Sequence, residues 1–255
     1  MSEPKAGCFI CGEDLVYTDS PVSVQCSYCG MGYESDVQCS SGHYICDVCH
    51  SADANELIEK FCISSRSIDP LEMALTLMRS PKVKMHGPEH HFLVPAVLIT
   101  AYFNVTNEEQ RENNKDNRDQ TRNPEPETRT DLKKMLKKAR GRAENVLGGF
   151  CGLYGDCGAA VGTGIFISII TGATPLTKES WGLSNLITAR SLHTIALHGG
   201  PRCCKRNTYL ALTEAVAFLK EHFDVELEMD EDIKCEFNSF NKECLEDECR
   251  YYKVL

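Results

Sequence analysis

Residues 148–175 read GGFCGLYGDCGAAVGTGIFISIITGATP, and a second turn at residues 199–209 reads GGPRCCKRNTY. In both stretches, cysteines on a glycine-rich turn lead directly into an apolar pattern typical of a helix. Glycine lets the backbone approach another group closely, and a helix N-terminus offers free N–H groups and a partial positive charge. This environment favours a bound anion or a metal-bound thiolate. We therefore expect the two turns to face each other across one cofactor, most simply an iron–sulfur cluster.

The composition bounds the classes of protein that the chain can belong to. A length of 255 residues with 42% hydrophobic and 25% charged residues allows one sizeable core and a small extra module. A net charge of −10 argues against a nonspecific nucleic-acid binder, because neutralising phosphates needs clustered Lys and Arg. The one basic run, at residues 133–142, is interpreted as the solvated face of a helix. We expect no nucleic-acid partner.

The number of cysteines, 15, is the most informative feature of the composition. The N-terminal residues MSEPKAGC lack the apolar core of a secretory signal, so we expect a cytoplasmic protein whose CxxC pairs bind metals. The uncharged run at residues 158–174 is too short and too rich in small residues for a membrane span, and we expect it to form a buried helix. No membrane association is expected.

Residues 1–52 form a cysteine-rich module with almost no helical periodicity. Four ligand pairs supply enough groups for two tetrahedral zinc sites. The eight candidate zinc ligands are Cys8, Cys11, Cys26, Cys29, Cys39, His43, Cys46 and Cys49. Fourteen residues separate the first two pairs, which is close to zinc-ribbon spacing. Either the first two pairs share one metal and the last two another, or the pairs interleave. We interpret the module as a folding staple, with a docking surface as the alternative.

Residues 53–255 carry the apolar periodicity of a helical domain. Asp69-Pro70 is a typical helix start and Gly148-Gly149 a typical helix end. The expected helices cover residues 54–63, 70–78, a stretch starting near 92, 131–146, 177–197 with an interruption at 181–184, and 208–222. We expect a polar loop or linker at about 107–130, and residues 225–229 are the best strand candidate. The predicted fold is mainly α: a helical domain around a cysteine-ligated cluster, with a small N-terminal zinc-ribbon-like module.

Thiolates from separated turns are the usual ligands of an iron–sulfur cluster. The candidates at the centre of the chain are Cys151, Cys157, Cys203 and Cys204, with Cys235, Cys244 and Cys249 in reserve. If three cysteines hold a [4Fe–4S] cluster, one iron stays open and can act as a Lewis acid. If four bind, a structural or electron-carrying role is favoured.

The two glycine-rich stretches resemble a known family. The pattern GDCGAAVGTG followed by IITGATP is similar to the cysteine-bearing helix and following turn of the iron–sulfur L-serine dehydratase α domain and of the related cysteine desulfidases, and PRCCKRNTYLAL resembles that family's second cluster motif. The resemblance covers residues 148–222. It implies an all-helical fold with Cys157 and Cys203 as cluster ligands, Arg206 and Asn207 on the family's Arg-Asn pair, and a cluster that activates a leaving group without redox change.

The chain departs from that family's pattern at the third ligand. The family's third cysteine follows the second within about a dozen residues, whereas here no cysteine lies between Lys205 and Lys234. Cys204, Cys151 or a tail cysteine would have to complete the set. Taken whole, the chain also resembles an uncharacterised cysteine-rich family of anaerobic microbes, some members of which are joined to methyltransferases.

The expected function is a [4Fe–4S] enzyme of the lyase or sulfur-transfer class acting on a small thiol- or hydroxyl-bearing substrate. Lys205, His198 and His193 near the second turn are candidate bases, and His90 of the HGPEHH segment is another. Candidate substrate-binding residues are Arg202, Arg206, Asn207 and His91. The alternative is a non-catalytic zinc and iron–sulfur accessory protein that serves a partner enzyme such as a methyltransferase. A purely zinc-binding regulator is the third hypothesis.

Overall fold

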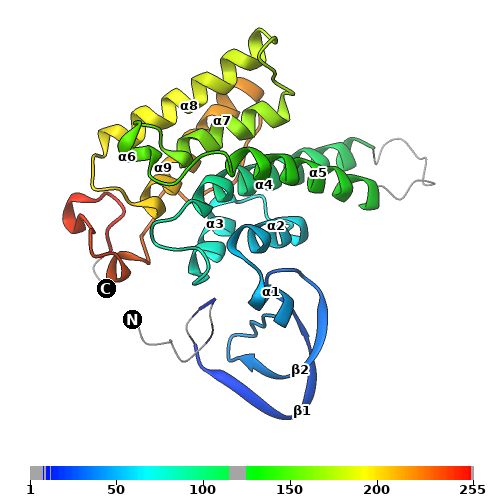
Figure 1. The fold of residues 1–255 in the computed structure, drawn as a ribbon. Helices are drawn as coiled ribbons and strands as arrows, with labels where there is room; N and C mark the ends of the chain where they lie inside the picture. The colour runs from blue at the N-terminus through cyan, green and yellow to red at the C-terminus, as the bar shows by residue number, and fades with distance from the viewer. Residues whose placement is uncertain (1–7, 9, 12, 115–124, 254–255) are drawn as a thin grey trace.

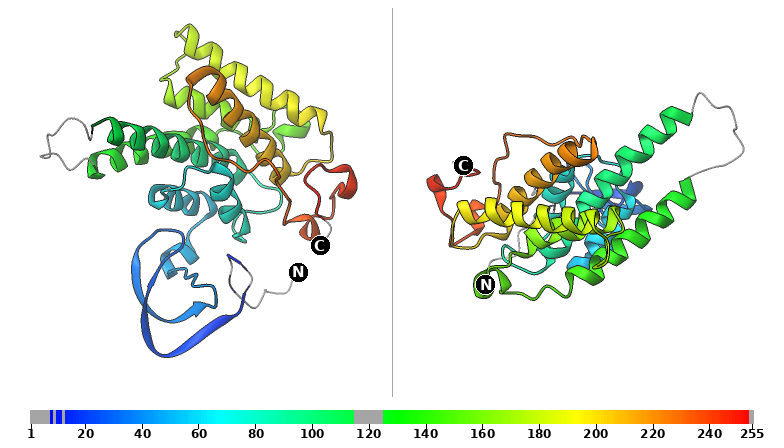
Figure 2. Two further views of the ribbon diagram at one scale, coloured as in Figure 1. Left: turned by 180° about the vertical axis from the view of Figure 1, so that it is seen from behind. Right: turned by 90° about the horizontal axis from the view of Figure 1, so that it is seen from above.

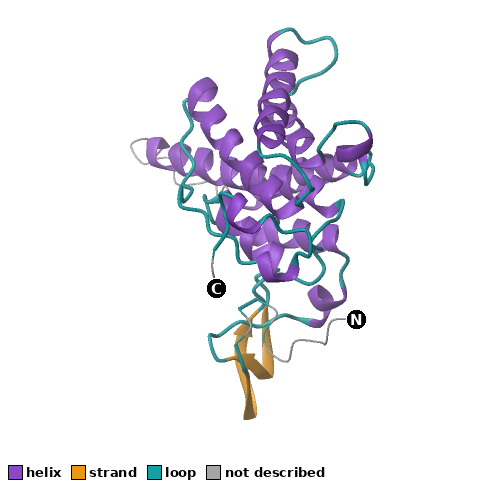
Figure 3. Ribbon diagram, turned by 90° about the vertical axis from the view of Figure 1, so that its left-hand side faces the viewer, coloured by secondary structure: helices purple, strands orange, loops and turns teal. Residues whose placement is uncertain are grey.

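The computed structural model describes residues 8, 10–11, 13–114 and 125–253. A small cysteine-rich module lies at one end, and helices form the rest of the regular structure (Figures 1 and 3). The prediction of a mainly α protein with a cysteine-rich N-terminal module that could hold metal is therefore confirmed.

The N-terminal module is built on a hairpin that the sequence did not indicate. Strand β1 (Leu15–Gln25) pairs antiparallel with β2 (Gly32–Cys39), with a bulge between Tyr17 and Val22, and a short helix α1 (Asp47–Ser51) follows. Most side chains of both strands are exposed or half-buried, and the sequence offers only short apolar–polar alternations, such as VSVQ at residues 22–25. The turns at the ends of the hairpin carry cysteines.

Eight helices form the main domain. They are α2 (Ala54–Ser64), α3 (Pro70–Arg79), α4 (Glu89–Asn114), α5 (Glu125–Ala143), α6 (Phe150–Leu153), α7 (Gly158–Ile170), α8 (Glu179–Leu197) and α9 (Cys204–Phe223) among the described residues. The apolar helix α4 is central and packs against α2, α3, α5, α7 and α9. Asp69 caps α3 by accepting hydrogen bonds from the N–H groups of Leu71 and Glu72, as the Asp-Pro start predicted.

The glycines of α7 allow two neighbouring helices to approach. A side chain at Gly162 would lie 2.8 Å from Pro95 Cδ of α4, and one at Gly164 would collide with Thr188 of α8. These two glycines therefore serve helix packing, whereas the sequence suggested that glycines here admit a cofactor. The run is the buried helix that we expected, and within the described residues no helix is long and apolar enough to cross a membrane.

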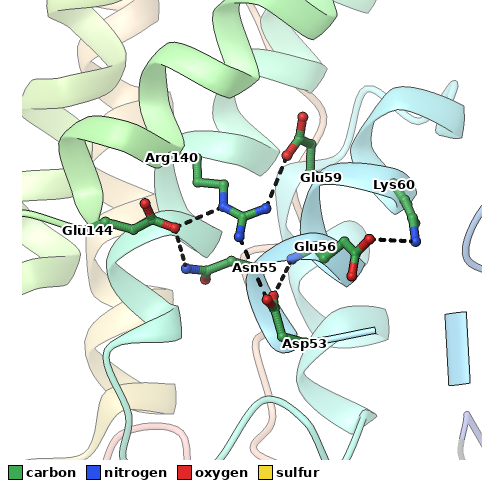
Figure 4. A network of polar contacts seen from close by, with 7 residues as sticks. All are labelled: Asp53, Asn55, Glu56, Glu59, Lys60, Arg140 and Glu144. Atoms are coloured by element: carbon green, nitrogen blue, oxygen red, sulfur yellow. Dashed lines mark hydrogen bonds and ion pairs between the residues drawn. The ribbon is translucent and has the colours of Figure 1, made fainter. Parts of the chain in front are cut away.

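Helix α5 is held on α2 by a network of polar contacts around Arg140 (Figure 4). Its guanidinium contacts Glu144 at 2.8 Å, Glu59 at 3.4 Å and Asp53 at 3.7 Å. Arg142, on the same helix, donates to Ser168 Oγ of α7 at 2.9 Å. The basic run is thus not solely a solvated face, because two of its arginines connect helices.

Four sequence-based expectations about the elements were wrong. Helix α8 runs without the interruption expected at residues 181–184, and residues 225–229 form no strand. Most of the expected polar loop is helix: α4 extends to Asn114 and α5 begins at Glu125, while 115–124 lie outside the described residues. Gly148 and Gly149 do not end the preceding helix, which stops at Ala143.

The tail after α9 follows an irregular path beside the beginning of that helix (Figure 2). Residues 224–253 contain two short 3-10 turns, η1 (Asn238–Phe240) and η2 (Glu246–Glu248). Arg79 of α3 donates to Glu236 at 2.8 Å, and His86 Nε2 lies 3.1 Å from Asn241 Oδ1. The tail is thereby fixed to the helical domain.

Candidate metal centres

All eight ligand candidates of the N-terminal module gather into two groups that could hold metal ions. Within each group the ligand atoms lie within 4.8 Å of one another. One group is Cys8, Cys11, Cys39 and His43; the other is Cys26, Cys29, Cys46 and Cys49. The first ligand pair therefore joins the third and the second joins the fourth. Of the two pairings that the sequence left open, the structure has the interleaved one.

The distances within these groups match those around a tetrahedral zinc ion. Zn–S bonds of about 2.3 Å in a tetrahedron place the sulfurs about 3.8 Å apart. The sulfurs of Cys11 and Cys39 are 3.8 Å apart, as are those of Cys29 and Cys46. Cys39 Sγ lies 3.3 Å from His43 Nδ1. The spacing fits zinc, whose identity here is a proposal.

Main-chain N–H groups point at several of these sulfurs. Ile10 donates to Cys8 Sγ at 3.4 Å and His43 to Cys39 Sγ at 3.2 Å. Hydrogen bonds to a sulfur favour its thiolate form, the form that binds metal. Burial acts to raise the pKa of Cys46. Hydrogen bonds, of which the one with Tyr33 has the largest effect, outweigh burial and lower this pKa to about 7. This thiol therefore gives up its proton readily to a metal.

The second group is anchored directly on the helical domain. The turn between Cys26 and Cys29 carries Tyr28, whose buried ring meets the edge of Phe61 in α2. Ser64 Oγ donates to the carbonyl of Tyr28 at 2.9 Å. An ion at this group would thus stiffen the contact surface between the module and α2.

The two glycine-rich turns meet, as the sequence predicted. Cys157 is the N-cap of α7 and Cys203 is the N-cap of α9. Asn207, in the first turn of α9, donates from Nδ2 to Cys157 Sγ at 3.3 Å. Because α7 and α9 begin side by side, their cysteines and free N–H groups lie at one place in the molecule.

Two cavities adjoin at this place. The smaller, of about 250 Å³, is lined by three cysteines, Cys151, Cys157 and Cys204. The larger, of about 910 Å³, opens between α6, α8 and the start of α9. Residues common to both linings include Cys151, Cys157, Arg202 and Asn207. A group bound by the three cysteines would therefore face the larger space.

Cys203 belongs to a different cavity from its neighbour Cys204. It lines a third, small cavity together with Cys235, Cys244 and Cys249 of the tail. Of the four central cysteines that we predicted to act together, three therefore line the cavity of 250 Å³ and the fourth, Cys203, lines a different one. The tail cysteines, which the sequence left in reserve, are the partners of Cys203.

Two of the predicted catalytic residues are buried and fully engaged in the core. Lys205 donates to the carbonyls of Met78 at 2.9 Å and Val83 at 3.0 Å, and burial lowers its pKa to about 8. His90 has a partner at each ring nitrogen, Thr208 Oγ1 at 3.0 Å and the Lys84 carbonyl at 3.1 Å. Burial lowers the pKa of His90 to about 3, so its ring is neutral. Lys205 thus connects α9 to the end of α3 and to the segment after it. His90 connects α4 to α9 and to the same segment.

The remaining candidate bases are placed differently. The Nδ1 atom of His198, the C-cap of α8, lies 2.8 Å from the carbonyl oxygen of Thr194. His198 lines neither the cavity of 910 Å³ nor the cavity of 250 Å³. His193, one helical turn earlier, lines the cavity of 910 Å³. His91 lines the smaller cavity, where its ring lies so close to Gly158 that a side chain there would overlap it. Because Nδ1 of His91 contacts the Val146 carbonyl at 2.9 Å, that nitrogen carries the proton in the neutral ring.

The two arginines of the second turn have distinct positions. Arg202 is exposed and lines both the cavity of 910 Å³ and the cavity of 250 Å³. Arg206 is buried and donates to the carbonyls of Gly199 at 2.6 Å and Pro201 at 3.0 Å. Arg206 thus fixes the loop that carries Arg202. A substrate carboxylate could reach Arg202, whereas Arg206 already has main-chain acceptors.

The helical part of this architecture matches one family model. Residues 58–125 and 120–252, more than half of the chain, match a family of unknown function, DUF5714. The chain belongs to this family. The match starts after the N-terminal module, so the family's matched region holds the helical domain, both glycine-rich turns and the tail cysteines. No curated protein and no solved structure matches the chain.

Proposed function

We propose that the protein is a [4Fe–4S]-dependent, non-redox lyase or sulfur-transfer enzyme acting on a small carboxylate with a thiol or hydroxyl group. The observation that carries the proposal is the set of three free cysteines, Cys151, Cys157 and Cys204, around one cavity that adjoins a larger one. The resemblance of residues 148–222 to iron–sulfur serine dehydratases and cysteine desulfidases supports it at Cys157, whereas the second ligand that the resemblance implies, Cys203, lines another cavity and Cys204 stands in its place.

The residues around the smaller cavity fit a thiolate-bound cluster. The donors are three soft sulfur atoms, and Asn207 already donates a hydrogen bond to one of them. A [4Fe–4S] cluster held by three thiolates supplies one open iron, a Lewis acid for a hydroxyl, thiol or sulfide.

The chain's own side chains would bind the substrate and move its proton. The exposed guanidinium of Arg202 can pair with a carboxylate through two parallel hydrogen bonds, and Arg206 keeps its loop in place. In an elimination, a base removes a proton from carbon while the hydroxyl or sulfide leaves the neighbouring carbon. His193 lines the larger cavity and is the base candidate best placed for this step.

The second candidate function is a non-catalytic accessory protein. Large apolar side chains near α6 and along α8 are exposed, including Leu153 at 80%, Trp181 at 52% and Leu197 at 73%. Such surfaces are typical of protein contacts. A partner enzyme such as a methyltransferase would bind there and receive electrons, sulfur or a substrate.

Metal analysis of protein purified without oxygen tests the proposal. Replacing Cys157 with Ser should remove about four irons and four sulfides per chain, with zinc unchanged. Cys62→Ala is the matched control, because Cys62 is buried in α2, outside the linings of the described cavities, and should leave iron unchanged. Unchanged iron in the Cys157→Ser variant would contradict the cluster assignment.

Mössbauer spectra and substrate trials then separate the two functions. An enzyme should show one iron site distinct from the other three and should release sulfide from L-cysteine or ammonia from L-serine. A cluster with four equivalent thiolate-bound irons and no turnover of either substrate would favour the accessory protein.

A further inference from the structure

Four cysteines from two distant segments converge beside the start of α9. Cys203 caps this helix, and the tail brings Cys235, Cys244 and Cys249 to the same small cavity. The space open there to the centre of a water molecule is about 20 Å³. All four cysteines are free and half-buried. Four thiols around one enclosed space are a complete ligand set for a thiolate-bound metal group.

The turns that carry these cysteines have the geometry seen at the N-terminal metal groups. The N–H two residues after a cysteine donates to its sulfur at 3.4 Å in Cys235–Phe237 and in Cys244–Glu246. The same contact at the same distance links Cys8 and Ile10 in the first N-terminal group. At Cys203, the donor is the N–H of Arg206, also at 3.4 Å. Main-chain N–H groups directed at sulfur favour the thiolate.

Three buried donors beside this cavity lack an acceptor. The Nε of Arg206 and the hydroxyls of Tyr209 and Tyr251 are buried without hydrogen-bond partners, and all three residues line the cavity. Leaving such groups unpaired in the protein interior costs free energy. An anionic group with acceptor atoms, held among the four sulfurs, would satisfy them.

The spacing of the sulfurs favours a cluster over a single ion. In each of the two N-terminal groups, all ligand atoms lie within 4.8 Å of one another. Within the described part of the chain, the four cysteines beside α9 do not form a group this tight. In a [4Fe–4S] cluster each thiolate binds a different iron, so its ligand sulfurs stand further apart than those on one zinc. The cluster's sulfides are also acceptors for nearby N–H and O–H groups.

The tail itself lacks the regular structure that would hold it together. Between residues 224 and 253 it has two 3-10 turns, and its ends meet through the N–H of Cys235 and the carbonyl of Tyr251 at 2.7 Å. Short segments without a core of their own are commonly fixed by a metal. A cluster would link this loop to the N-terminus of α9.

We propose that Cys203, Cys235, Cys244 and Cys249 bind a second [4Fe–4S] cluster, coordinated by all four cysteines. With no open iron, this cluster is structural or electron-carrying. It lies next to the site of the proposed function, because Cys203 and Cys204 are consecutive residues that line different cavities. The proposal does not depend on that function, since the two ligand sets share no residue.

The test uses the full chain purified without oxygen. Wild-type protein should contain about eight irons and eight sulfides, and the Cys235→Ser/Cys244→Ser variant about half of each. The matched variant Cys157→Ser/Cys204→Ser should also keep about half, and combining all four substitutions should leave none. Cys62→Ala should match the wild type.

The outcomes are decisive for each cluster separately. An iron content unaffected in a folded Cys235→Ser/Cys244→Ser variant would overturn the second cluster, whereas about four irons in the wild type that this variant loses would overturn the first. Zinc beyond about two ions per chain, lost with Cys235 and Cys244, would show a single-ion site and also overturn the second cluster. If the tail variant fails to fold, electron paramagnetic resonance of the reduced Cys157→Ser/Cys204→Ser variant decides. This variant should show the spectrum of one cluster, and the absence of a cluster signal would refute the proposal.

Discussion

Arg140 shows how much one side chain can contribute to the contact between two helices. Its guanidinium reaches two carboxylates of the α2 segment, Asp53 and Glu59, and one just after the end of its own helix, Glu144. The arginine side chain is 27% exposed, so water screens these ion pairs less than it screens those on an open surface. The three acidic partners also raise the pKa of Arg140, the hydrogen bond with Glu144 first.

Replacing Arg140 with Met should lower the free energy of unfolding by about 1–3 kcal/mol, because three carboxylates lose their shared partner. Lys134→Met is the matched control on the same helix. Its ion pair with Asp131 is mostly exposed, so we expect a change within about 0.5 kcal/mol. Urea unfolding followed by circular dichroism measures both. Equal effects of the two substitutions would show that the network adds nothing beyond a surface pair.

Helix α7 depends on small residues because it is pressed between α4 and α8. A Cβ at Gly162 would lie 2.8 Å from Pro95 Cδ and 3.2 Å from Val94 Cβ. Neither atom belongs to a flexible side-chain end, so α4 itself would have to move. Gly182 in α8 has open space where its side chain would be.

Gly162→Ala should therefore destabilise the protein by about 1–3 kcal/mol through overpacking. Gly182→Ala should stabilise it by about 0.5–1 kcal/mol, because alanine favours a helix and nothing obstructs its methyl group. Thermal or urea unfolding of the two variants gives the comparison. Stabilisation by both would mean that α7 and α4 are not in tight contact.

The whole N-terminal module depends on which ligand pairs share a metal. Because the pairs interleave, one ion would link the segment before β1 to the end of β2, and the other would link the turn of the hairpin to α1. Tyr28 and Ser64 then transmit this rigidity to α2. The pairing can be tested independently of any structure determination.

Two double variants distinguish the pairings by zinc content. Cys11→Ser/Cys39→Ser removes two ligands from one interleaved site, so about one zinc per chain should remain. Cys11→Ser/Cys29→Ser damages both sites, and almost no zinc should remain. Sequential pairing predicts the reverse result for the two variants. Mass spectrometry under non-denaturing conditions counts the ions directly.

The sequence predicted those features that depend on local chemistry. The ligand pairs of the N-terminal module, the Asp69 cap and the position of Cys157 directly before α7 follow from residue types at short spacings, whereas α9, expected from residue 208, begins at Cys204. The hairpin was missed because its strands are held by their ends and bury few side chains. The tail strand was wrongly expected at residues 225–229, where alternate burial of Val225 and Leu227 against the helices imitates a strand pattern.

The grouping of the remaining chemical groups could not be predicted because it depends on tertiary packing. Nothing local distinguishes Cys203 from Cys204, yet they line different cavities. Lys205 and His90 read as catalytic in the sequence, and only the fold shows their main-chain and hydroxyl partners. The single available clue to the second four-cysteine set was the number of cysteines in the tail.

Interleaved pairing also constrains the order in which the protein can be assembled during synthesis. The first ligand pair, at Cys8 and Cys11, must wait for Cys39 and His43, and the second, at Cys26 and Cys29, must wait for Cys46 and Cys49. A nascent chain that ends anywhere within the hairpin therefore has no complete site, and both sites become complete within a few residues of each other. Any metal capture in this module would accordingly be a late, nearly simultaneous event, after the hairpin has left the ribosome.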